Sequence, residues 1–432
     1  MDPFIFILAD DLTGSADAAN YFRGGRRRVR VTFTGDAPWN FTLGADIVQV
    51  RDTESRALPP AEAQWRIEHA ASPLARQSGP LRLFKKIDST LRGNVGIELE
   101  TTLRVLGWSR AVLAPAFPAN RRAVRRGRLI VDGIPVTQTS LGRDPRAPIR
   151  ADRVADVVHE TSDLAVYEVG LDQVRAGPSR LAELLWSLPA FPGIAVCDAE
   201  TQNDLDTIAR AIGTSSTLLP CGSAGLAEAI AGVWSDGDGA ARPGQVKGSR
   251  VRRPPRQRCR EVLVAVGTVN PVAHEQLAVL RQATGVPIVA IRPRALVAAA
   301  SRESEVARAR EEAVRSRGPI LAVAVSMEGI DEVAGRAPHF EEDLARVGVA
   351  WLESRPLREA EALGLVCTGG DTTLALCRAL GAQAIWPEGE ISPGVPWSGI
   401  EGPRRTMLLA SKAGGFGAPS ALLDAVRFLT EG

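Results

Sequence analysis

Short apolar runs alternate with amphipathic segments along most of the chain, and this alternation constrains the fold more than any other feature. The runs are short enough for buried strands, and the segments between them have helical spacing. Buried strands that alternate with helices are typical of parallel sheets with helices on their faces. The first part of the chain is expected to hold strands at 4–9, 29–34, 46–50, 81–87, 111–114, 194–197 and 216–220, with helices at 14–23, 61–71, 94–106 and 201–212.

The alternation stops at residues 235–258, which are rich in Gly, Pro and Arg and contain almost no large apolar residue. This composition indicates a linker. The sequence therefore predicts two α/β domains, 1–234 and 259–432, with mainly parallel sheets and a cleft between them, where small molecules commonly bind. The second domain is expected to hold strands at 261–266, 287–291, 319–325 and 364–367, with helices at 272–283, 303–315 and 372–380.

Composition narrows the function classes. The 52 Lys and Arg nearly balance the 50 Asp and Glu, for a net charge of +2, which argues against a dedicated nucleic-acid or membrane-surface binder. The 5 cysteines form no CxxC pair, so a disulfide framework or structural zinc site is not expected. The N-terminus lacks signal-peptide features, and no uninterrupted apolar window reaches membrane-spanning length. A cytoplasmic protein is expected.

The first motif, ADDLTGSADAA at 9–19, runs from a predicted strand into a helix. Asp10 and Asp11 should therefore lie at the carboxyl end of the strand, where open α/β sheets bind ligands. Adjacent carboxylates there suit hydroxyl groups or a hydrated Mg²⁺. The alternative is one helix-capping acid beside one solvated acid. The order Asp-x-Asp-x-Thr of the HAD-type phosphatases is not matched.

The second motif, KKIDSTLRGN at 85–94, has the same strand–turn–helix setting. Asp88 can cap the turn, Arg92 and Lys86 can hold an anion, and Asn94 can bind a carboxylate or a hydroxyl. We expect a site for an anionic substrate, with a capped helix and surface charge as the alternative.

Two further strand-end loops could complete this polar site. RDTESR at 51–56 offers Arg56, and APAFPANRR at 114–122 offers Asn120 and Arg121. Each loop is equally compatible with an ordinary surface connection.

The second domain contains glycine-rich turns, at VAVGTVNP, CTGGDTT and SKAGGFGAPS, each between a predicted strand and a helix. Backbone amides in such turns favour phosphate. None matches the Walker A or GxGxxG pattern, but their recurrence in one domain indicates a nucleotide phosphate site. The residues expected to contact it are Thr268, Gly369, Gly370, Asp371, Thr372, Lys412, Gly414 and Gly415.

From the residues alone, one domain suits a small polyhydroxy acid and the other suits phosphates, so phosphoryl transfer between them is the economical interpretation. The motifs at 9–19 and 85–94, CGSAGLAEAI at 221–230, TGGDTT, PGVPW at 393–397 and SKAGGFG also resemble, in this order, the four-carbon acid sugar kinase family. The resemblance covers nearly the whole chain. It implies an N-terminal domain that binds the sugar acid and a C-terminal domain that binds ATP.

The resemblance further implies ATP-dependent phosphorylation of the terminal hydroxyl of threonate, erythronate or 3-oxo-tetronate. As part of the mechanism, Mg²⁺ is expected to bridge the phosphates. Carried over by motif, the substrate-side residues are Asp10, Asp11, Arg56, Asp88 and Arg92, with Thr268 and the glycine turns on the ATP side. Two positions depart from the family pattern: GTVNP stands where a Ser/Cys-rich turn is common, and AGGFG replaces an SGNFG-like turn.

As a mechanism we expect in-line attack of the hydroxyl on the γ-phosphate, with Arg92 and Lys86 holding the substrate carboxylate. Asp88 and Asp371 are the predicted catalytic acids, and Asp10 and Asp11 are further candidates for the proton acceptor. The sequence identifies no metal ligand and leaves a homodimer open. A kinase of another hydroxy acid and a non-catalytic sugar-acid sensor remain alternative functions.

Overall fold

The chain divides into two compact units, Met1–Lys247 and Gly248–Gly432. The computed structural model describes residues 3–24, 27–33, 39–77, 79–139, 149–189, 192–213, 215, 217–235, 258–328, 340–355, 362–392, 394–402 and 406–431. Apart from its two end residues, the predicted linker at 235–258 lies outside the described residues.

Unit 1 is built on a parallel sheet with the strand order β2-β3-β1-β4-β11-β5-β10-β9. Consecutive strands along this order all pair in parallel. The central strand β1 is buried over nearly its whole length, as its uninterrupted apolar sequence FIFILA predicts. The strands are β1 (Phe4–Ala9), β2 (Arg28–Thr32), β3 (Ile47–Asp52), β4 (Leu81–Lys86), β5 (Arg110–Ala114), β9 (Ala165–Val169), β10 (Gly193–Cys197) and β11 (Leu218–Gly222).

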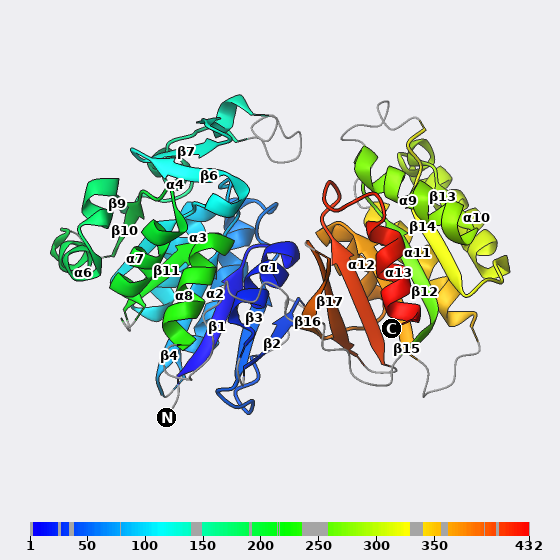
Figure 1. The fold of residues 1–432 in the computed structure, drawn as a ribbon, viewed down its shortest axis with the longest axis horizontal. Coiled ribbons are helices and arrows are strands. Elements are labelled where there is room, and N and C mark those ends of the chain that lie inside the picture. Colours follow the sequence, from blue (N-terminus) through cyan, green and yellow to red (C-terminus); the bar gives the residue numbers. More distant parts are fainter. Residues whose placement is uncertain are drawn as a thin grey trace. The chain divides into compact units, whose positions relative to one another are not determined.

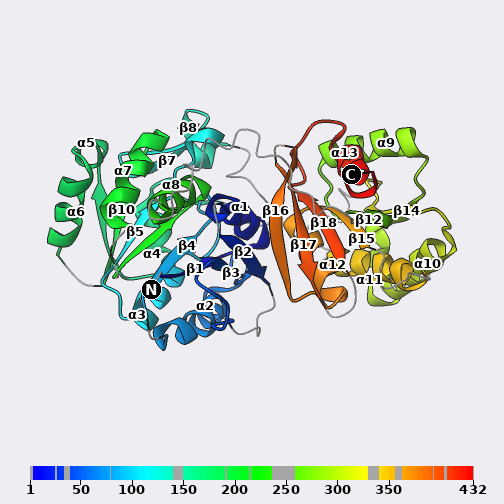
Figure 2. The same cartoon turned by 60° about the horizontal axis from the view of Figure 1, so that its bottom comes forward.

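Helices cover both faces of this sheet (Figures 1 and 2). Helices α1, α7 and α8 pack in a row on one face, and α2 packs against α3 on the other. The helices of unit 1 are α1 (Leu12–Phe22), α2 (Pro60–Ala75), α3 (Val95–Leu106), α4 (Val154–His159), α5 (Leu171–Arg175), α6 (Pro178–Ser187), α7 (Gln202–Ile212) and α8 (Ala224–Ser235), with 3₁₀ turns at Pro118–Asn120 and Val136–Gln138.

The segment that follows β5 forms a small antiparallel sheet. It consists of β6 (Arg122–Arg125), β7 (Arg128–Val131) and β8 (Ile134–Pro135). This sheet was not predicted, because its strands are short and none contains more than three consecutive apolar residues. This β6–β7 hairpin brings one arginine back to the main sheet, as described below.

Unit 2 has the strand order β13-β14-β12-β15-β18-β17-β16. The first five strands in this order, from β13 through β14, β12 and β15 to β18, pair in parallel. Strands β18, β17 and β16 form an antiparallel end. Helices α9 and α13 pack together, and α11 packs between α10 and α12. The elements are β12 (Cys259–Val266), α9 (Pro271–Thr284), β13 (Ile288–Ile291), a 3₁₀ turn (Pro293–Leu296), α10 (Ala299–Arg315), β14 (Ile320–Val325), α11 (Phe340–Glu353), β15 (Ala362–Thr368), α12 (Gly370–Ala379), β16 (Ala384–Ser392), β17 (Val395–Glu401), β18 (Met407–Lys412) and α13 (Ala421–Thr430).

The predicted α/β class with mainly parallel sheets is confirmed, and the predicted strands and helices lie within a few residues of the observed ones. The strands β16 and β17, which form the antiparallel end with β18, were not predicted, because Pro and Gly interrupt both of them. The cleft between the domains stays a prediction.

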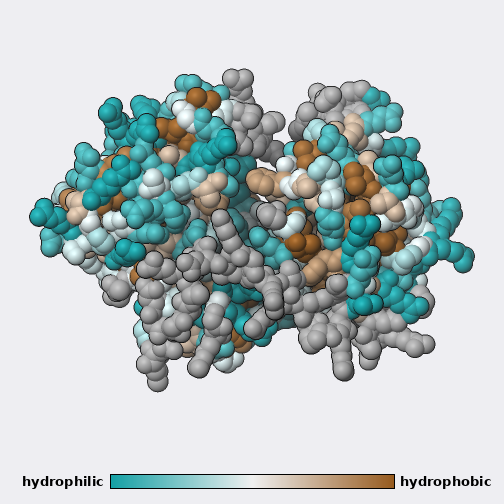
Figure 3. All heavy atoms as spheres, in the orientation of Figure 1, coloured by the Kyte–Doolittle hydropathy of each residue, from teal (hydrophilic) through white to brown (hydrophobic). Residues whose placement is uncertain are grey.

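On the face drawn in Figure 3, hydrophobic residues lie scattered among hydrophilic ones. Among the described helices, none is both long enough and apolar enough to span a bilayer.

Candidate active site

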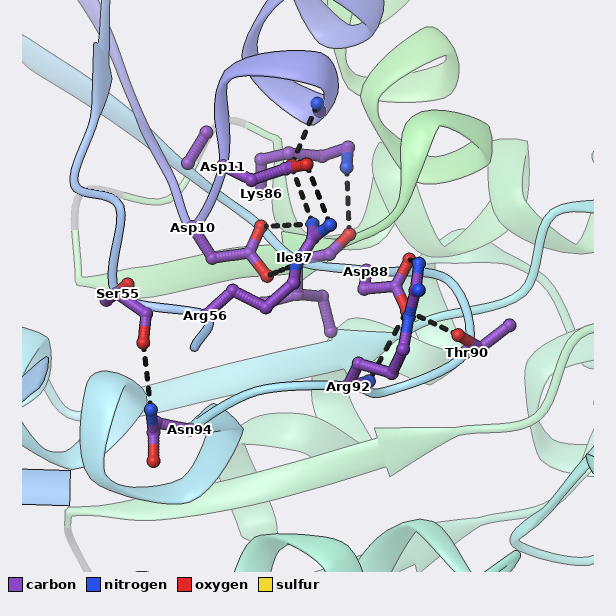
Figure 4. Close-up of polar contacts among 12 residues, drawn as sticks. Asp10, Asp11, Ser55, Arg56, Lys86, Ile87, Asp88, Thr90, Arg92 and Asn94 are labelled. Atoms are coloured by element: carbon purple, nitrogen blue, oxygen red, sulfur yellow. Dashed lines mark hydrogen bonds and ion pairs between the residues drawn. The ribbon is translucent and has the colours of Figure 1, made fainter. Parts of the chain in front are cut away.

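The polar motifs of unit 1 meet at the carboxyl edge of its sheet, where three parallel strands end side by side. Ala9, the last residue of β1, is in register with Asp52 of β3 and with Lys86 of β4. The motifs that follow these strands therefore leave the sheet at the same level. Figure 4 shows their side chains pointing toward one another, and this edge is where open α/β sheets bind ligands.

Arg56 binds both acids of the first motif. Its Nε and Nη2 each donate to an Asp10 carboxylate oxygen at 2.9 Å, and its Nη1 and Nη2 donate to the Asp11 oxygens at 2.7 and 2.6 Å. Asp11 also caps α1, because its Oδ1 accepts the Gly14 amide at 2.9 Å. The sequence prediction that these residues lie together is confirmed, and Arg56 directs its guanidinium to the two acids.

The two neighbouring carboxyls differ in acidity. Burial raises the pKa of Asp10, but the ion pair with Arg56 more than offsets this, so its pKa lies below the ordinary value. Burial also raises the pKa of Asp11, and Arg56 offsets only part of that effect, so its pKa stays above the ordinary value. The Asp11 side chain is 25% exposed against 3% for Asp10. Asp11 is therefore the more basic and the more accessible of the two.

Asp88 organises the turn that follows β4. Its Oδ2 accepts from Arg92 Nε at 2.7 Å and from the Thr90 hydroxyl, while its Oδ1 accepts from Arg92 Nη2 at 3.2 Å. Burial raises the pKa of Asp88, but Arg56 and then Arg92 hold that pKa well below its ordinary range. Asp88 is therefore a permanent anion at neutral pH, and it occupies the fork of Arg92.

The same turn contains a residue with a strained backbone. Leu91 is buried with φ at 63°, a conformation that non-glycine residues rarely adopt and that persists where the surrounding structure enforces it. Gly93 has φ at 104°, and a Cβ there would lie 3.3 Å from the Arg56 Cα. The turn thus packs directly against the Arg56 backbone, which fixes the second motif relative to the 51–56 loop.

Lys86 and Asn94 complete the predicted set, with different roles. Lys86 Nζ donates to the Ile87 carbonyl at 2.9 Å and lies so close to Gly14 that a Cβ there would be 2.7 Å away. Asn94 Nδ2 donates to the carbonyls of Ser55 and Leu58 at 2.8 and 2.9 Å. Asn94 therefore positions the loop that carries Arg56, and its predicted contact with substrate stays a prediction.

A buried ion pair fixes the strand beneath the site. Lys85 and Glu98 are almost fully buried, and their Nζ and Oε2 atoms lie 2.6 Å apart. Burial lowers the pKa of Lys85, but Glu98 and Asp10 more than restore it, so the ammonium stays charged. This pair ties the end of β4 to the first turn of α3, on either side of the Asp88 turn.

One arginine of this site was not predicted. In the 114–122 loop the predicted candidate was Arg121, but that side chain is 83% exposed and pairs with Asp132. The next residue, Arg122, instead directs its Nη1 to the Ser89 hydroxyl. The selection of Arg122 depends on the left-handed conformation of Arg121, with φ at 54°, which a pair of arginines does not reveal.

The glycine turns of unit 2 also converge at a carboxyl edge. Thr368, the last residue of β15, is in register with Val266 of β12 and with Lys412 of β18. A Cβ at Gly267 would lie 2.0 Å from Thr372 Oγ1, and one at Gly414 would lie 2.7 Å from Thr268 Oγ1. The three predicted turns are therefore in contact, and glycine is required where they touch.

The turn at Gly369 begins helix α12. Gly369 has φ at 91°, and its amide donates to the Lys412 carbonyl at 2.8 Å, which joins two of the turns. Thr372 is buried in the first helical turn, whereas Asp371 is exposed there. Helix α12 begins at Gly370, so its N-terminus lies at the junction of the turns, a setting that favours anions.

Lys412 and Gln276 hold the last turn. Lys412 Nζ donates to the Gly414 carbonyl at 3.0 Å, and burial lowers the pKa of Lys412 to about 8. The fully buried Gln276 donates from Nε2 to the carbonyls of Phe416, Gly417 and Ala418 at 2.9–3.1 Å. Gln276 was not predicted, although a polar residue on the apolar face of the predicted helix was a signal for it.

No group of three or more His, Cys, Asp or Glu side chains among the described residues could hold a metal ion. All 5 cysteines are buried free thiols. The described part of the chain therefore offers carboxylates, arginines and phosphate-type turns rather than a preformed metal centre.

Two family descriptions match the chain. The sugar-binding N-terminal domain matches residues 5–230, and the nucleotide-binding C-terminal domain matches residues 263–422. Together they span both candidate sites.

Relatives that match this chain over most of their length are kinases of four-carbon sugar acids. A D-threonate kinase of Salmonella typhimurium is 32% identical, covering 99% of this chain and 98% of the relative. A D-erythronate kinase of Heliobacterium modesticaldum is 30% identical over 90% of this chain and 88% of the relative. A 3-oxo-tetronate kinase of Pseudomonas fluorescens is 30% identical over 96% and 94%.

Solved structures show the same fold. A Salmonella typhimurium LT2 protein superimposes with a TM-score of 0.75 at 21% identity, covering 98% of this chain and 99% of the other. A Haemophilus influenzae protein superimposes with a TM-score of 0.72 at 20% identity, covering 98% and 100%.

Proposed function

Because this chain belongs to the four-carbon acid sugar kinase family, we propose that it transfers the γ-phosphoryl group of ATP to the terminal hydroxyl of a four-carbon sugar acid. The observation that carries the proposal is a pair of sites, each at the carboxyl edge of a sheet. The domain that matches a sugar-binding family has an Asp–Arg cluster there. The domain that matches a nucleotide-binding family has glycine turns that contact one another. D-threonate is the first substrate to test, since the D-threonate kinases are 31–33% identical to this chain.

In unit 1, the acids and cations suit a small molecule that carries both hydroxyls and a carboxylate. Asp10 and Asp11 can accept hydrogen bonds from hydroxyls while Arg56 holds their geometry. Such pre-positioned groups supply the orientation on which phosphoryl transfer mainly depends.

In unit 2, the contacting turns around Gly267, Gly369 and Gly414 form the proposed phosphate cradle. Glycine allows the backbone amides to approach phosphate oxygens closely, and Lys412 adds a positive charge beside them. Thr268 and Thr372 place hydroxyls in the same junction.

Mg²⁺ fits this arrangement as a companion of the nucleotide. Mg²⁺ is usually bound by one or two carboxylates together with substrate phosphates and water, and the exposed Asp371 beside the cradle supplies one carboxylate. The ion would neutralise charge on the phosphates, while the residues of the chain orient them.

The acidity of the candidate carboxyls separates their roles in this proposal. An effective general base has a pKa nearer to the working pH, and Asp11 is the unit 1 candidate whose pKa is raised and whose side chain is accessible. We assign proton acceptance to Asp11. Asp88, with its depressed pKa and its bonds to Arg92, orients the site as a permanent anion, and Asp371 acts at the phosphates.

The proposal is tested by measuring ADP release from ATP with D-threonate, D-erythronate and 3-oxo-tetronate. Release that depends on one of these acids is expected. Release only with other hydroxy acids would identify a different kinase. Thermal stabilisation by an acid without any ADP release would instead support a sugar-acid sensor.

Lys412 predicts a pH dependence on the nucleotide side. The ammonium is charged below its pKa of about 8 and neutral above it, so kcat/KM for ATP should fall as the pH rises through that value. Lys412→Arg should remove this decline, because guanidinium stays protonated. Identical declines in both proteins would show that another group titrates.

The proposal also covers the cellular compartment and the oligomeric state of the protein. We expect a cytoplasmic enzyme, because ATP is its donor and its thiols are unpaired. A homodimer stays a prediction that light scattering tests.

A further inference from the structure

The arginines of the unit 1 site differ in what they already bind. Arg56 donates to four carboxylate oxygens, and Arg92 directs its Nε and Nη2 to Asp88. Neither arginine can bind the carboxylate of a substrate with these same atoms unless it releases the aspartate that it already binds. To hold the substrate carboxylate as predicted, Arg92 would have to use the Nη1 side of its guanidinium, because Nε and Nη2 already bind Asp88.

Arg122 is differently placed. It donates from Nη1 to Ser89, a neutral hydroxyl in the turn between Asp88 and Thr90. No acceptor among the described residues lies within hydrogen-bonding distance of its buried Nε. Burial lowers the pKa of Arg122, and the nearby Asp88 offsets only part of this effect. Arg122 is thus a partly buried cation whose charge is incompletely compensated, and it lies beside the acids of the site.

The fold holds Arg122 rigidly. Its backbone amide donates to the Phe117 carbonyl at 3.1 Å, and its carbonyl accepts the Phe117 amide at 2.8 Å. Farther along the hairpin, Val124 exchanges hydrogen bonds of 2.8 and 3.0 Å with Ala199. Asp198 accepts the amides at the tip of the hairpin, from Arg126 at 2.7 Å and Gly127 at 2.9 Å.

We propose that Arg122 binds the carboxylate of the sugar acid, with the Ser89 hydroxyl as a second donor. This proposal rests on the proposed function, since it assigns one group of that substrate. The Ser89 oxygen accepts from Arg122, which leaves the Ser89 proton to donate to a carboxylate oxygen. Arginine suits this role because its planar fork matches a carboxylate.

The test measures binding of the acid to the full chain by calorimetry, without ATP, for wild type, Arg122→Ala and Arg122→Lys. Arg128→Ala is the matched control, since Arg128 lies in the same small sheet and pairs with Asp152 at the surface. A lost hydrogen bond to a charged group corresponds to a decrease in affinity of about 10- to 100-fold. We expect that decrease for Arg122→Ala, a smaller one for Arg122→Lys, and none for Arg128→Ala.

A neutral analogue separates a carboxylate contact from a merely structural role. Wild type should bind the acid more tightly than its primary amide, and Arg122→Ala should bind both equally weakly. Retained discrimination in Arg122→Ala would overturn the assignment, as would a rise in the KM for ATP with unchanged acid binding, which would place Arg122 at the transferred phosphoryl group. If wild type neither binds nor phosphorylates any four-carbon acid, the proposed function itself is wrong.

Discussion

Replacing Asp11 with asparagine is expected to lower kcat by about 100- to 10,000-fold, the range in which a positioned acid or base contributes. Asparagine keeps the size of the side chain but cannot accept the proton of the attacking hydroxyl. In wild type, kcat should rise with pH as the Asp11 carboxyl, whose pKa burial raises, ionises. The variant should lose this rise. Steady-state ADP release over a range of pH values measures both effects.

Asp88→Asn is the informative comparison, because it removes a negative charge from the same edge without removing the assigned proton acceptor. Asp88 binds Arg92 and Thr90, so its loss should loosen the turn and raise the KM for the sugar acid while the KM for ATP stays near its wild-type value. If Asp11→Asn keeps its turnover and Asp88→Asn loses it, Asp88 is the proton acceptor and the assignment made here is wrong.

Replacing Gly267 with valine is expected to raise the KM for ATP on the order of 100-fold. A Cβ at this position would lie 2.0 Å from Thr372 Oγ1, so valine must push the first turn of α12 away from the β12 turn. Overpacking of this kind costs up to about 3 kcal/mol, which corresponds to roughly a 150-fold change in affinity. Kinetics at saturating sugar acid, together with a melting curve, measure the effect.

Gly399→Val is the matched control in the same unit. No atom lies within 4 Å of a Cβ built on Gly399, which is in the middle of β17, and strands accept valine readily. This variant should keep the wild-type KM for ATP. Equal KM values for Gly267→Val and wild type, with similar melting temperatures, would exclude the β12 turn from the phosphate cradle.

Much of this architecture could be predicted because two physical rules act locally. A buried parallel strand is recognisable from its apolar run, and the residues that follow neighbouring strands must meet at one edge. Applied to this chain, these rules predict that Asp10, Arg56 and Asp88 lie close together at one sheet edge. They also predict that the turns at Gly267 and Gly369 meet at the edge of the other sheet.

The remaining features depend on contacts between residues distant in sequence. Whether Arg121 or Arg122 faces the site is decided by a left-handed residue and by pairing with Phe117. The pairing of Arg92 with Asp88, which occupies the Nε and Nη2 atoms of Arg92, closes a turn in which Leu91 has a strained conformation. A sequence shows that such arginines are present but does not show which of them are already neutralised.

The central claim is phosphoryl transfer to the terminal hydroxyl of a four-carbon sugar acid, and phosphorus NMR of the reaction mixture tests it most directly. Incubation of the full chain with ATP, Mg²⁺ and D-threonate, or with the acid that gives the highest rate of ADP release, should yield ADP and an equal amount of a phosphate monoester. The phosphorus of that ester should couple to the two protons of the terminal methylene group. Inorganic phosphate as the only product, a phosphorus coupled to a single methine proton, or no ATP consumption with any of the acids would contradict the account.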